Sequence, residues 1–389
     1  MAPLKRLAKG WLEQLRLPAA AKAAQRADRK GPFATDPGPE RAIAECLAWI
    51  GRAQDCSRTK DGGVARHYSL IDGWAPSYPE TTGYIVATLI AAGESQASEE
   101  WLVRARRMLD WLLAIQFPEG GFQGGMVTQT PRVPVTFNTG QILIGLAAGA
   151  HLGARYRDAM VRAADWLVQS QDPDGCWRRH PTPFAEAGEK VYETHVSLGL
   201  FRAHTVEPGR SYQAAATKQV DWALKGQAPN GWLANCCLSD PVHPLTHTLG
   251  YALRGIVEAF LSTGDQRYLA AAQKTADGLL SALRPDGTLP GRLDSAWRAS
   301  ADYVCLTGAS QVAESWLLLN RATKRDDYLR AARLTNSFVR RTILIDGAPE
   351  VRGGVKGSYP VDGDYGRWQY LNWAAKFTID ANLAELGRF

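Results

Sequence analysis

The sequence predicts an all-α protein, a closed (α/α)6 toroid in which six inner helices lie inside a ring of six outer helices. Three observations predict it: a turn that recurs six times, an amphipathic helical pattern before each turn, and an apolar helical pattern after it. A period of this length indicates a repeat architecture. The turn is an acidic or amide residue followed by glycine, spaced by 55 to 60 residues, at Asp61-Gly62, Glu119-Gly120, Asp174-Gly175, Asn230-Gly231, Asp286-Gly287 and Asp346-Gly347.

The segments before the turns have the spacing of helices with one apolar face, and most of them end in an amide or a base. They are predicted as the outer helices, at residues 42–54, 101–116, 160–171, 214–227, 268–284 and 328–341. Trp111, Trp166 and Trp222 each follow an aspartate at the same place in an outer helix, so we assign them to the repeat core.

The segments after the turns are apolar on most faces, as an inner ring requires. They are predicted as the inner helices, beginning near Glu80, Asn138, Glu193, Thr246, Thr307 and Leu371. In an alternating ring these six N-termini point to the same end. Their partial positive charge and free N–H groups suit an anionic or hydroxyl-rich ligand, so we predict the site at that end.

Composition argues against a disordered chain, a nucleic-acid-binding protein and a disulfide-rich secreted protein. A hydrophobic fraction of 45% and a charged fraction of 22% are typical of a globular chain, and the net charge of +6 accompanies no nucleic-acid motif. The six cysteines show no paired spacing, which favours a reduced, cytosolic setting. We expect residues 36–389 to form one toroidal domain, since a closed ring needs no capping repeats.

Residues 1–35 form a basic N-terminal segment. Within it, Leu4, Leu7, Trp11 and Leu15 fall near one helical face, beside lysines and arginines. Residues 1–17 are therefore a candidate amphipathic helix for peripheral contact with the inner membrane surface. The alternatives are a helix packed on the domain or a loose tail. The segment lacks the apolar core of a signal peptide.

Two sequence patterns resemble known toroidal families. WLVQSQDPDGCW and WLLAIQFPEGGF resemble repeats of the prenyltransferase and squalene-cyclase superfamily, and the toroid as a whole is similar to that of six-hairpin glycosidases, unsaturated glucuronyl hydrolases, N-acylglucosamine epimerases and polysaccharide lyases. The blocks SYPETTGY, FNTGQ, THTLGYALRG, CLTGASQ and GSYPVDGDYGRWQYLNWAAKF together resemble toroidal proteins associated with bacterial polysaccharide production. The resemblance spans roughly residues 40 to 389 and implies a carbohydrate substrate.

The isoprenoid branch fits less well. A squalene-type cyclase needs an Asp-x-Asp-Asp cluster, which this chain lacks. Cys236 and Cys237 with His243 and His247 could supply zinc ligands, but adjacent cysteines rarely chelate one tetrahedral ion, so buried inert cysteines are the favoured interpretation. We expect neither a metal nor another cofactor.

The first candidate catalytic residue is Glu80, because Pro79 suits a first helical position and would aim the carboxyl group into the cavity. A helix cap is the alternative. Glu193 and His195 occupy the corresponding place in the third hairpin, where a carboxylate beside an imidazole is a common device for proton transfer. A structural role is an equal alternative for His195.

His247, Tyr251 and Arg254 fall on one face of an inner helix. In a polysaccharide lyase such a set abstracts the proton beside a uronate carboxylate, which the arginine neutralises. The alternative is a set of ties between hairpins. Asp294 is a further candidate catalytic carboxylate, because glycoside hydrolysis requires two.

Polar and aromatic residues at the inner-helix starts and in their loops have the composition of a sugar-binding surface. The candidate substrate-binding residues are Trp74, Tyr78, Asn138, Gln141, Trp177, Arg254, Trp297, Tyr359, Asp364, Arg367, Trp368 and Lys376. Asp364 could instead form a turn, with Asp362 beside it.

These residues favour a cytoplasmic carbohydrate-active enzyme acting on a bacterial, acidic polysaccharide or a lipid-linked oligosaccharide, with no nucleic-acid partner. Glycoside hydrolysis is the first hypothesis, and elimination by a polysaccharide lyase or epimerisation of a uronate is the second. An isoprenoid cyclase or prenyltransferase-like enzyme, and a non-catalytic sugar-binding protein of a polysaccharide assembly complex, are alternatives of other classes.

Overall fold

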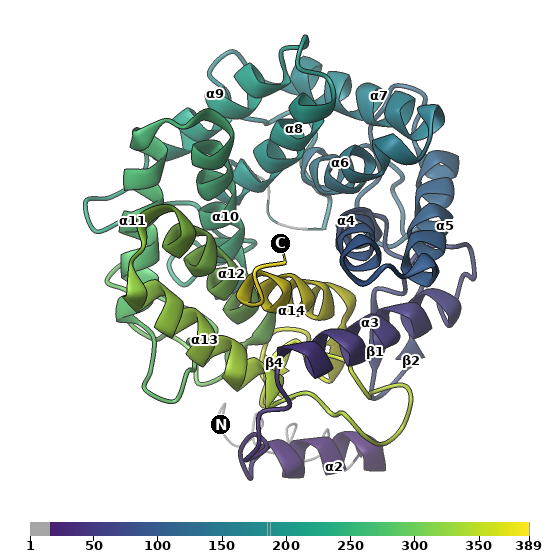
Figure 1. Cartoon of the computed structure of the whole chain (residues 1–389), viewed down its shortest axis with the longest axis vertical. Helices are drawn as coiled ribbons and strands as arrows, with labels where there is room; N and C mark the ends of the chain where they lie inside the picture. Colours follow the sequence, from purple (N-terminus) through teal and green to yellow (C-terminus); the bar gives the residue numbers. More distant parts are fainter. Residues whose placement is uncertain (1–15, 185, 187, 389) are drawn as a thin grey trace, which may run out of the picture.

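The predicted toroid is confirmed in a computed structural model, which describes residues 16–184, 186 and 188–388. Twelve helices alternate between an outer and an inner ring (Figure 1). The outer helices are α3 (Pro39–Asp55), α5 (Glu99–Ile115), α7 (Ala154–Ser170), α9 (Tyr212–Leu224), α11 (Gln266–Ser281) and α13 (Asp326–Arg340). The inner helices are α4 (Pro79–Gln96), α6 (Thr136–Gly149), α8 (Thr194–Val206), α10 (Thr246–Thr263), α12 (Leu306–Thr323) and α14 (Asn372–Glu385).

Neighbouring inner helices approach closely because glycines face one another. A Cβ added to Gly145 of α6 would lie 1.9 Å from the carbonyl oxygen of Gly83 in α4. A Cβ on Gly199 of α8 would lie 2.5 Å from the carbonyl oxygen of Gly140 in α6. These distances leave no room for a side chain, so glycine sets the spacing of this part of the ring.

The recurring turn has a structural reason. All six of its glycines adopt positive φ, from 82° to 110°, a region that suits glycine. A Cβ on Gly120, Gly175 or Gly231 would also lie within 2.2–2.4 Å of a backbone oxygen of the next outer helix. The turn is therefore a contact between consecutive hairpins.

Two further repeated bonds join neighbouring outer helices. The side-chain amide of Gln171 donates to the carbonyl oxygens of Gly175, in its own turn, and Ala215, in α9. Gln54 and Gln116 make the corresponding pairs of bonds, each with one bond to its own turn and one to the next outer helix. The aspartates that precede the outer-helix tryptophans accept from tyrosines of the following outer helix, in the pairs Asp110–Tyr156, Asp165–Tyr212 and Asp221–Tyr268.

The ring closes where the first and last hairpins meet. Helix α14 packs against both α3 and α4. At the end where the inner helices begin, β1 (His67–Ser69) pairs antiparallel with β5 (Gln369–Leu371) and with β2 (Gly73–Trp74). A second small sheet joins β3 (Val304–Cys305) to β4 (Ser358–Tyr359), and 3-10 turns η1 (Ala150–Leu152) and η2 (Val191–Glu193) complete the regular structure.

Helix α2 (Ala19–Asp28) lies outside the ring (Figure 1) and is bonded to the segment around β4. The Asp28 carboxylate is buried and binds the Lys356 ammonium and the backbone N–H of Val361, and the Tyr359 hydroxyl donates to the Asp28 carbonyl oxygen. Most of the amphipathic helix predicted over residues 1–17 falls outside the described residues. In the part of the chain that the structure describes, no helix combines the length and the apolarity needed to cross a membrane.

The glutamine bond between hairpins predicts a specific loss of stability. Replacing Gln171 by alanine leaves two carbonyl oxygens without their donor, so we expect the free energy of unfolding in urea to fall by about 2 kcal/mol. Gln96→Ala, at an exposed site with no described hydrogen bond, is the matched control and should change it by less than about 0.5 kcal/mol. Equal effects of the two substitutions would contradict this role.

Candidate functional site

The interior of the ring holds two cavities, one at each end. The proximal cavity, about 340 Å³, lies where the inner helices begin and is lined by residues that include Glu80, Asn138 and His247. The distal cavity, about 690 Å³, lies where the inner helices end and is lined by residues that include His195, Arg254 and Lys376. The residues expected to share one site are therefore not all together: some line one of these cavities, and others lie outside both.

A layer of rings separates the two cavities. The hydroxyl oxygens of Tyr84 and Tyr251, both facing the proximal cavity, are 3.4 Å apart. Phe377 and His195, which face the distal cavity, pack against them, with ring centroids 5.4 Å apart for Tyr84 and Phe377 and 4.5 Å for Tyr251 and His195. Residues that line the proximal cavity are therefore in direct contact with residues that line the distal cavity.

Glu80 is the central acid of the proximal cavity. Pro79 is the first residue of α4, as expected, and Glu80 follows it. The carboxylate oxygen Oε2 accepts hydrogen bonds from the Tyr78 hydroxyl at 2.9 Å and the Asn138 amide at 2.8 Å. Burial raises the pKa of Glu80 to about 7, although both bonds and the nearby Arg66 guanidinium lower it. At neutral pH this carboxyl group can therefore either donate or accept a proton.

Arg66 supplies positive charge to the same cavity. Its guanidinium stacks 4.9 Å from the ring centroid of Trp373 and 5.7 Å from that of Tyr78. The Arg66 guanidinium donates a hydrogen bond to His67 Nδ1. Burial is the main cause that lowers the pKa of His67 to about 3, and the charge of Arg66 lowers it further. An arginine held against aromatic rings in a cavity can bind a carboxylate group.

His247 and Tyr251 are neighbours on α10, as predicted, with ring centroids 4.5 Å apart. His247 Nδ1 is 2.8 Å from Gln311 Oε1, so Nδ1 carries the proton and Nε2 is the acceptor. Burial lowers the pKa of His247 to about 4 and holds the pKa of Tyr251 well above its usual value. Near neutral pH the imidazole is uncharged and the phenol keeps its proton.

Glu193 lies beside this cavity rather than in it. It ends η2 and lines a pocket of about 250 Å³ that shares Phe137, Thr182 and Tyr192 with the proximal cavity. Burial raises the pKa of Glu193 to about 8, and its Oε2 has no hydrogen-bond partner among the described residues. The proximal cavity itself has one carboxyl group, Glu80, among its described lining residues.

The remaining predicted residues lie outside the proximal cavity. Asp294 caps a turn, accepting from the backbone N–H groups of Ala296 and Arg298 and pairing with the Arg298 side chain. Gln141 is buried with its oxygen 2.6 Å from His195 Nδ1. Six residues of the predicted rim pack against other residues of the chain or point to solvent: Trp74, Trp297, Tyr359, Asp364, Arg367 and Trp368. Trp177 lines the pocket of Glu193.

Several functional residues carried a weak signal in the sequence. Glu258, Glu314 and Asp380 are acids inside otherwise apolar inner helices, and two of them stand four residues after a base, Arg254 or Lys376. Charged residues in such a helix are rarely buried unless paired, which is the signal that could have revealed them. Arg66, Tyr365 and Trp373 reach the proximal cavity from loops or a helix start and carried no comparable signal.

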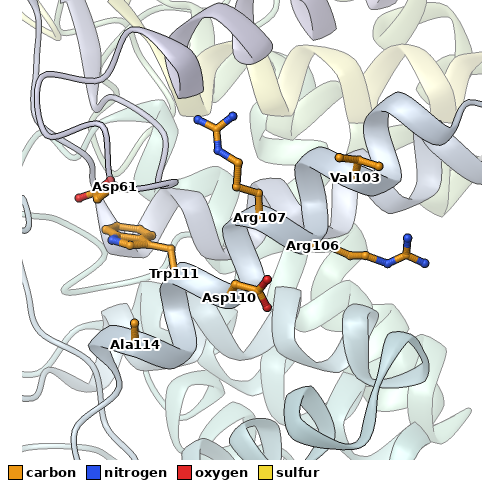
Figure 2. Close-up of a pocket in the computed structure, with 7 residues that line it drawn as sticks. All are labelled: Asp61, Val103, Arg106, Arg107, Asp110, Trp111 and Ala114. Carbon is orange, nitrogen blue, oxygen red and sulfur yellow. The ribbon is translucent and has the colours of Figure 1, made fainter.

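A further hollow, about 550 Å³, lies on the outer surface. Figure 2 shows that its lining comes from one outer helix, α5, and from Asp61 in the turn before α4. The carboxylate of Asp110, which α5 contributes to this hollow, already accepts hydrogen bonds from Tyr156 and Arg155 of the next outer helix. Asp110 therefore serves the contact between hairpins. Among the described residues no group of three histidine, cysteine or acidic side chains has the arrangement of a metal site.

The fold is shared with solved carbohydrate-processing enzymes. An unsaturated glucuronyl hydrolase specific for heparin matches with a TM-score of 0.68 at 14% identity, over 91% of this chain and 98% of that one. A cellobiose 2-epimerase from Bacillus thermoamylovorans matches with a TM-score of 0.71 at 13% identity, over 88% and 96%. A sugar epimerase from a ruminal bacterium matches with a TM-score of 0.72 at 12% identity, over 90% and 98%.

No family model and no curated protein matches the sequence. At 12–14% identity the structural matches establish the (α/α)6 toroid over nearly the whole chain. They do not carry a substrate or a reaction to this protein.

The raised pKa of Glu193 predicts how stability depends on pH. Its folded pKa of about 8 lies above 4.5, the ordinary value of a glutamate, so the protonated form is favoured in the fold. That stabilisation is complete below about pH 4.5 and is lost as the pH rises through 8. Glu193→Gln should therefore gain on the order of 3 kcal/mol in unfolding free energy, relative to the native chain, between pH 5 and pH 9.

Urea unfolding at a series of pH values measures this difference. Glu186→Gln is the matched control for the loss of a carboxyl group, because Glu186 lines the same pocket with an exposed side chain. A flat difference for Glu193→Gln would show that its carboxyl group is not buried as described.

Proposed function

We propose that this protein is a carbohydrate-active enzyme that abstracts the proton beside the carboxylate of a uronate residue in an acidic polysaccharide or lipid-linked oligosaccharide. This is the first step of both elimination and epimerisation. The observation that carries the proposal is the proximal cavity itself, in which a carboxyl group of pKa about 7, Glu80, shares the lining with Arg66, His247 and Tyr251.

In the proposed mechanism Glu80 is the base. A base is most effective when its pKa lies near the working pH, which favours Glu80 over His247, whose pKa of about 4 makes it a weaker base. Arg66 pairs with the uronate carboxylate and stabilises the charge that develops when the neighbouring carbon loses its proton. His247 Nε2 accepts a hydrogen bond from a sugar hydroxyl.

Tyr251 is the proposed proton donor. Its phenol keeps its proton at neutral pH and lies in the wall of the same cavity. In an elimination it would protonate the leaving glycosidic oxygen, whereas in an epimerisation it would return a proton to the opposite face of the carbon.

Glycoside hydrolysis is the second candidate. It is favoured by the same Glu80, since a carboxyl group half-protonated near pH 7 can protonate a leaving oxygen. Hydrolysis requires a second carboxylate across the bond, and Glu193, a buried acid in the adjoining pocket, is a candidate for it.

A cytoplasmic location and contact with a membrane surface stay predictions from the sequence.

The experiment that tests the reaction follows three signals in D₂O on uronate-rich polysaccharides and their carboxyl-reduced forms. Elimination predicts ultraviolet absorbance from an unsaturated product, and epimerisation predicts deuterium at the carbon beside the carboxylate, in both cases with the native polymers only. New reducing ends without absorbance or deuterium would identify hydrolysis and contradict proton abstraction.

Replacing Glu80 by glutamine should remove the base while keeping the shape of the cavity. We expect kcat/KM to fall by about 10³-fold. In the native enzyme kcat/KM should rise with pH through about 7, because the base acts in its ionised form. Glu40→Gln, at an exposed site in the first turn of α3, is the control for general effects of losing a carboxylate. A rate that falls above pH 7 would instead identify Glu80 as an acid.

Tyr251→Phe tests the proton donor. It removes one hydroxyl group and keeps the ring that packs against His195 and Phe377. We expect kcat to fall by about 10²-fold with KM changed little, since the lost interaction belongs to the transition state. A loss confined to KM would assign Tyr251 to binding alone.

A further inference from the structure

The distal cavity is built on a buried charge network that the proposed reaction does not use. Arg254 pairs with Glu258 at 2.7 Å and with Glu314 at 3.1 Å, and all three side chains are at most 6% exposed. Lys376 pairs with Asp380 at 2.5 Å on α14. Burying charged groups is costly even when they are paired, so a network of this kind at a cavity wall indicates a role beyond packing.

His195 gives this wall an acceptor without a donor. Its Nδ1 lies 2.6 Å from Gln141 Oε1 and therefore carries the proton, which leaves Nε2 as an acceptor. The side chain is 2% exposed, and no described residue donates to Nε2. Burial, with the charges of Lys376 and Arg254, holds the pKa of His195 well below its usual value, so the ring is neutral. A hydroxyl group of a ligand in this cavity would complete the hydrogen bond.

The charges of the wall favour a neutral ligand. The buried acids and bases are paired with one another, and Arg202 also pairs with Glu258. The remaining charged residues of the described lining, Glu94 and Arg388, are of opposite sign, so little net charge is left to attract an ion. The cavity also lies at the C-terminal ends of the inner helices, since Ser95, Ala148 and Thr205 line it. Helix C-termini carry partial negative charge and disfavour anions, in contrast to the proximal end.

We propose that the distal cavity is a second binding site, which takes a neutral, hydroxyl-rich molecule of the size of a mono- or disaccharide. A sugar hydroxyl would donate to His195 Nε2, and other hydroxyls would accept from Lys376 and Arg254. Phe377, Ile144 and Leu198 offer apolar surface to the C–H face of a sugar ring. A cavity of about 690 Å³ is within the range of small-molecule sites.

Isothermal titration with cellobiose tests this site, with sodium glucuronate and glucosamine as charged comparisons. Ala91→Trp fills the distal cavity, Thr205→Trp blocks its mouth from an exposed position, and Met126→Trp fills the proximal cavity. Ala114→Trp on the outer face of α5 is the matched control. The unfolding midpoint of each variant shows whether it folds.

We expect cellobiose to bind the native protein, Met126→Trp and Ala114→Trp equally, and to bind the folded distal variants at least about tenfold more weakly. Loss of binding in Met126→Trp with retention in both distal variants would overturn the proposal, because the sugar would then occupy the proximal cavity. Tighter binding of glucuronate or glucosamine than of cellobiose would overturn the ligand class. An absence of heat with all three sugars would overturn the site. These outcomes are independent of the reaction at Glu80.

Discussion

Closure of the ring is the constraint on which the rest of the molecule depends. Because α14 packs against α3 and α4, every inner helix has neighbours on both sides and an outer helix behind it. A polar side chain on an inner helix is therefore satisfied by a neighbouring inner or outer helix, or it faces a cavity. The charge network of Arg254 and the pair of Glu80 and Asn138 do both, because each joins two inner helices at the wall of a cavity.

The same constraint sets the electrostatics of the two ends. At the proximal end the inner helices begin, and Glu80 stands in the first turn of α4, where the helix dipole favours a carboxylate. Burial nevertheless outweighs the dipole and the two hydrogen bonds, which is why its pKa lies near 7. At the distal end the helices finish, and the buried charges pair internally. The toroid thus provides two chemically different cavities, separated by the rings of Tyr84, Tyr251, His195 and Phe377.

Much of the fold could be predicted from the sequence because the repeat is a contact that recurs in every hairpin. The turn glycines, the glutamines such as Gln171 and the aspartates such as Asp165 each bind the next hairpin, so they return at a constant spacing. The start of α4 at Pro79, and the neighbouring rings of His247 and Tyr251, followed from helix geometry alone.

The site was harder to predict because its residues do not repeat. Depth along an inner helix decides which cavity a side chain faces, and sequence spacing places Tyr251 and Arg254 on one face without saying that the ring layer falls between them. Arg66 and Trp373 meet only because the first and last hairpins join at the closure of the ring. Rim aromatics such as Trp297 pack against other residues of the repeat instead of facing a cavity. Composition alone does not predict which way such a side chain points.

The most direct test of this account is the titration of the Glu80 carboxyl group itself. Carbon-13 NMR of protein labelled at glutamate, assigned by the signal that disappears in Glu80→Gln, gives its pKa without any assumption about the substrate. We expect a midpoint near pH 7, because burial outweighs the bonds from Tyr78 and Asn138. A midpoint near 4.5, the value of an unburied glutamate, would contradict both the closed proximal cavity and the role of Glu80 as a base at neutral pH.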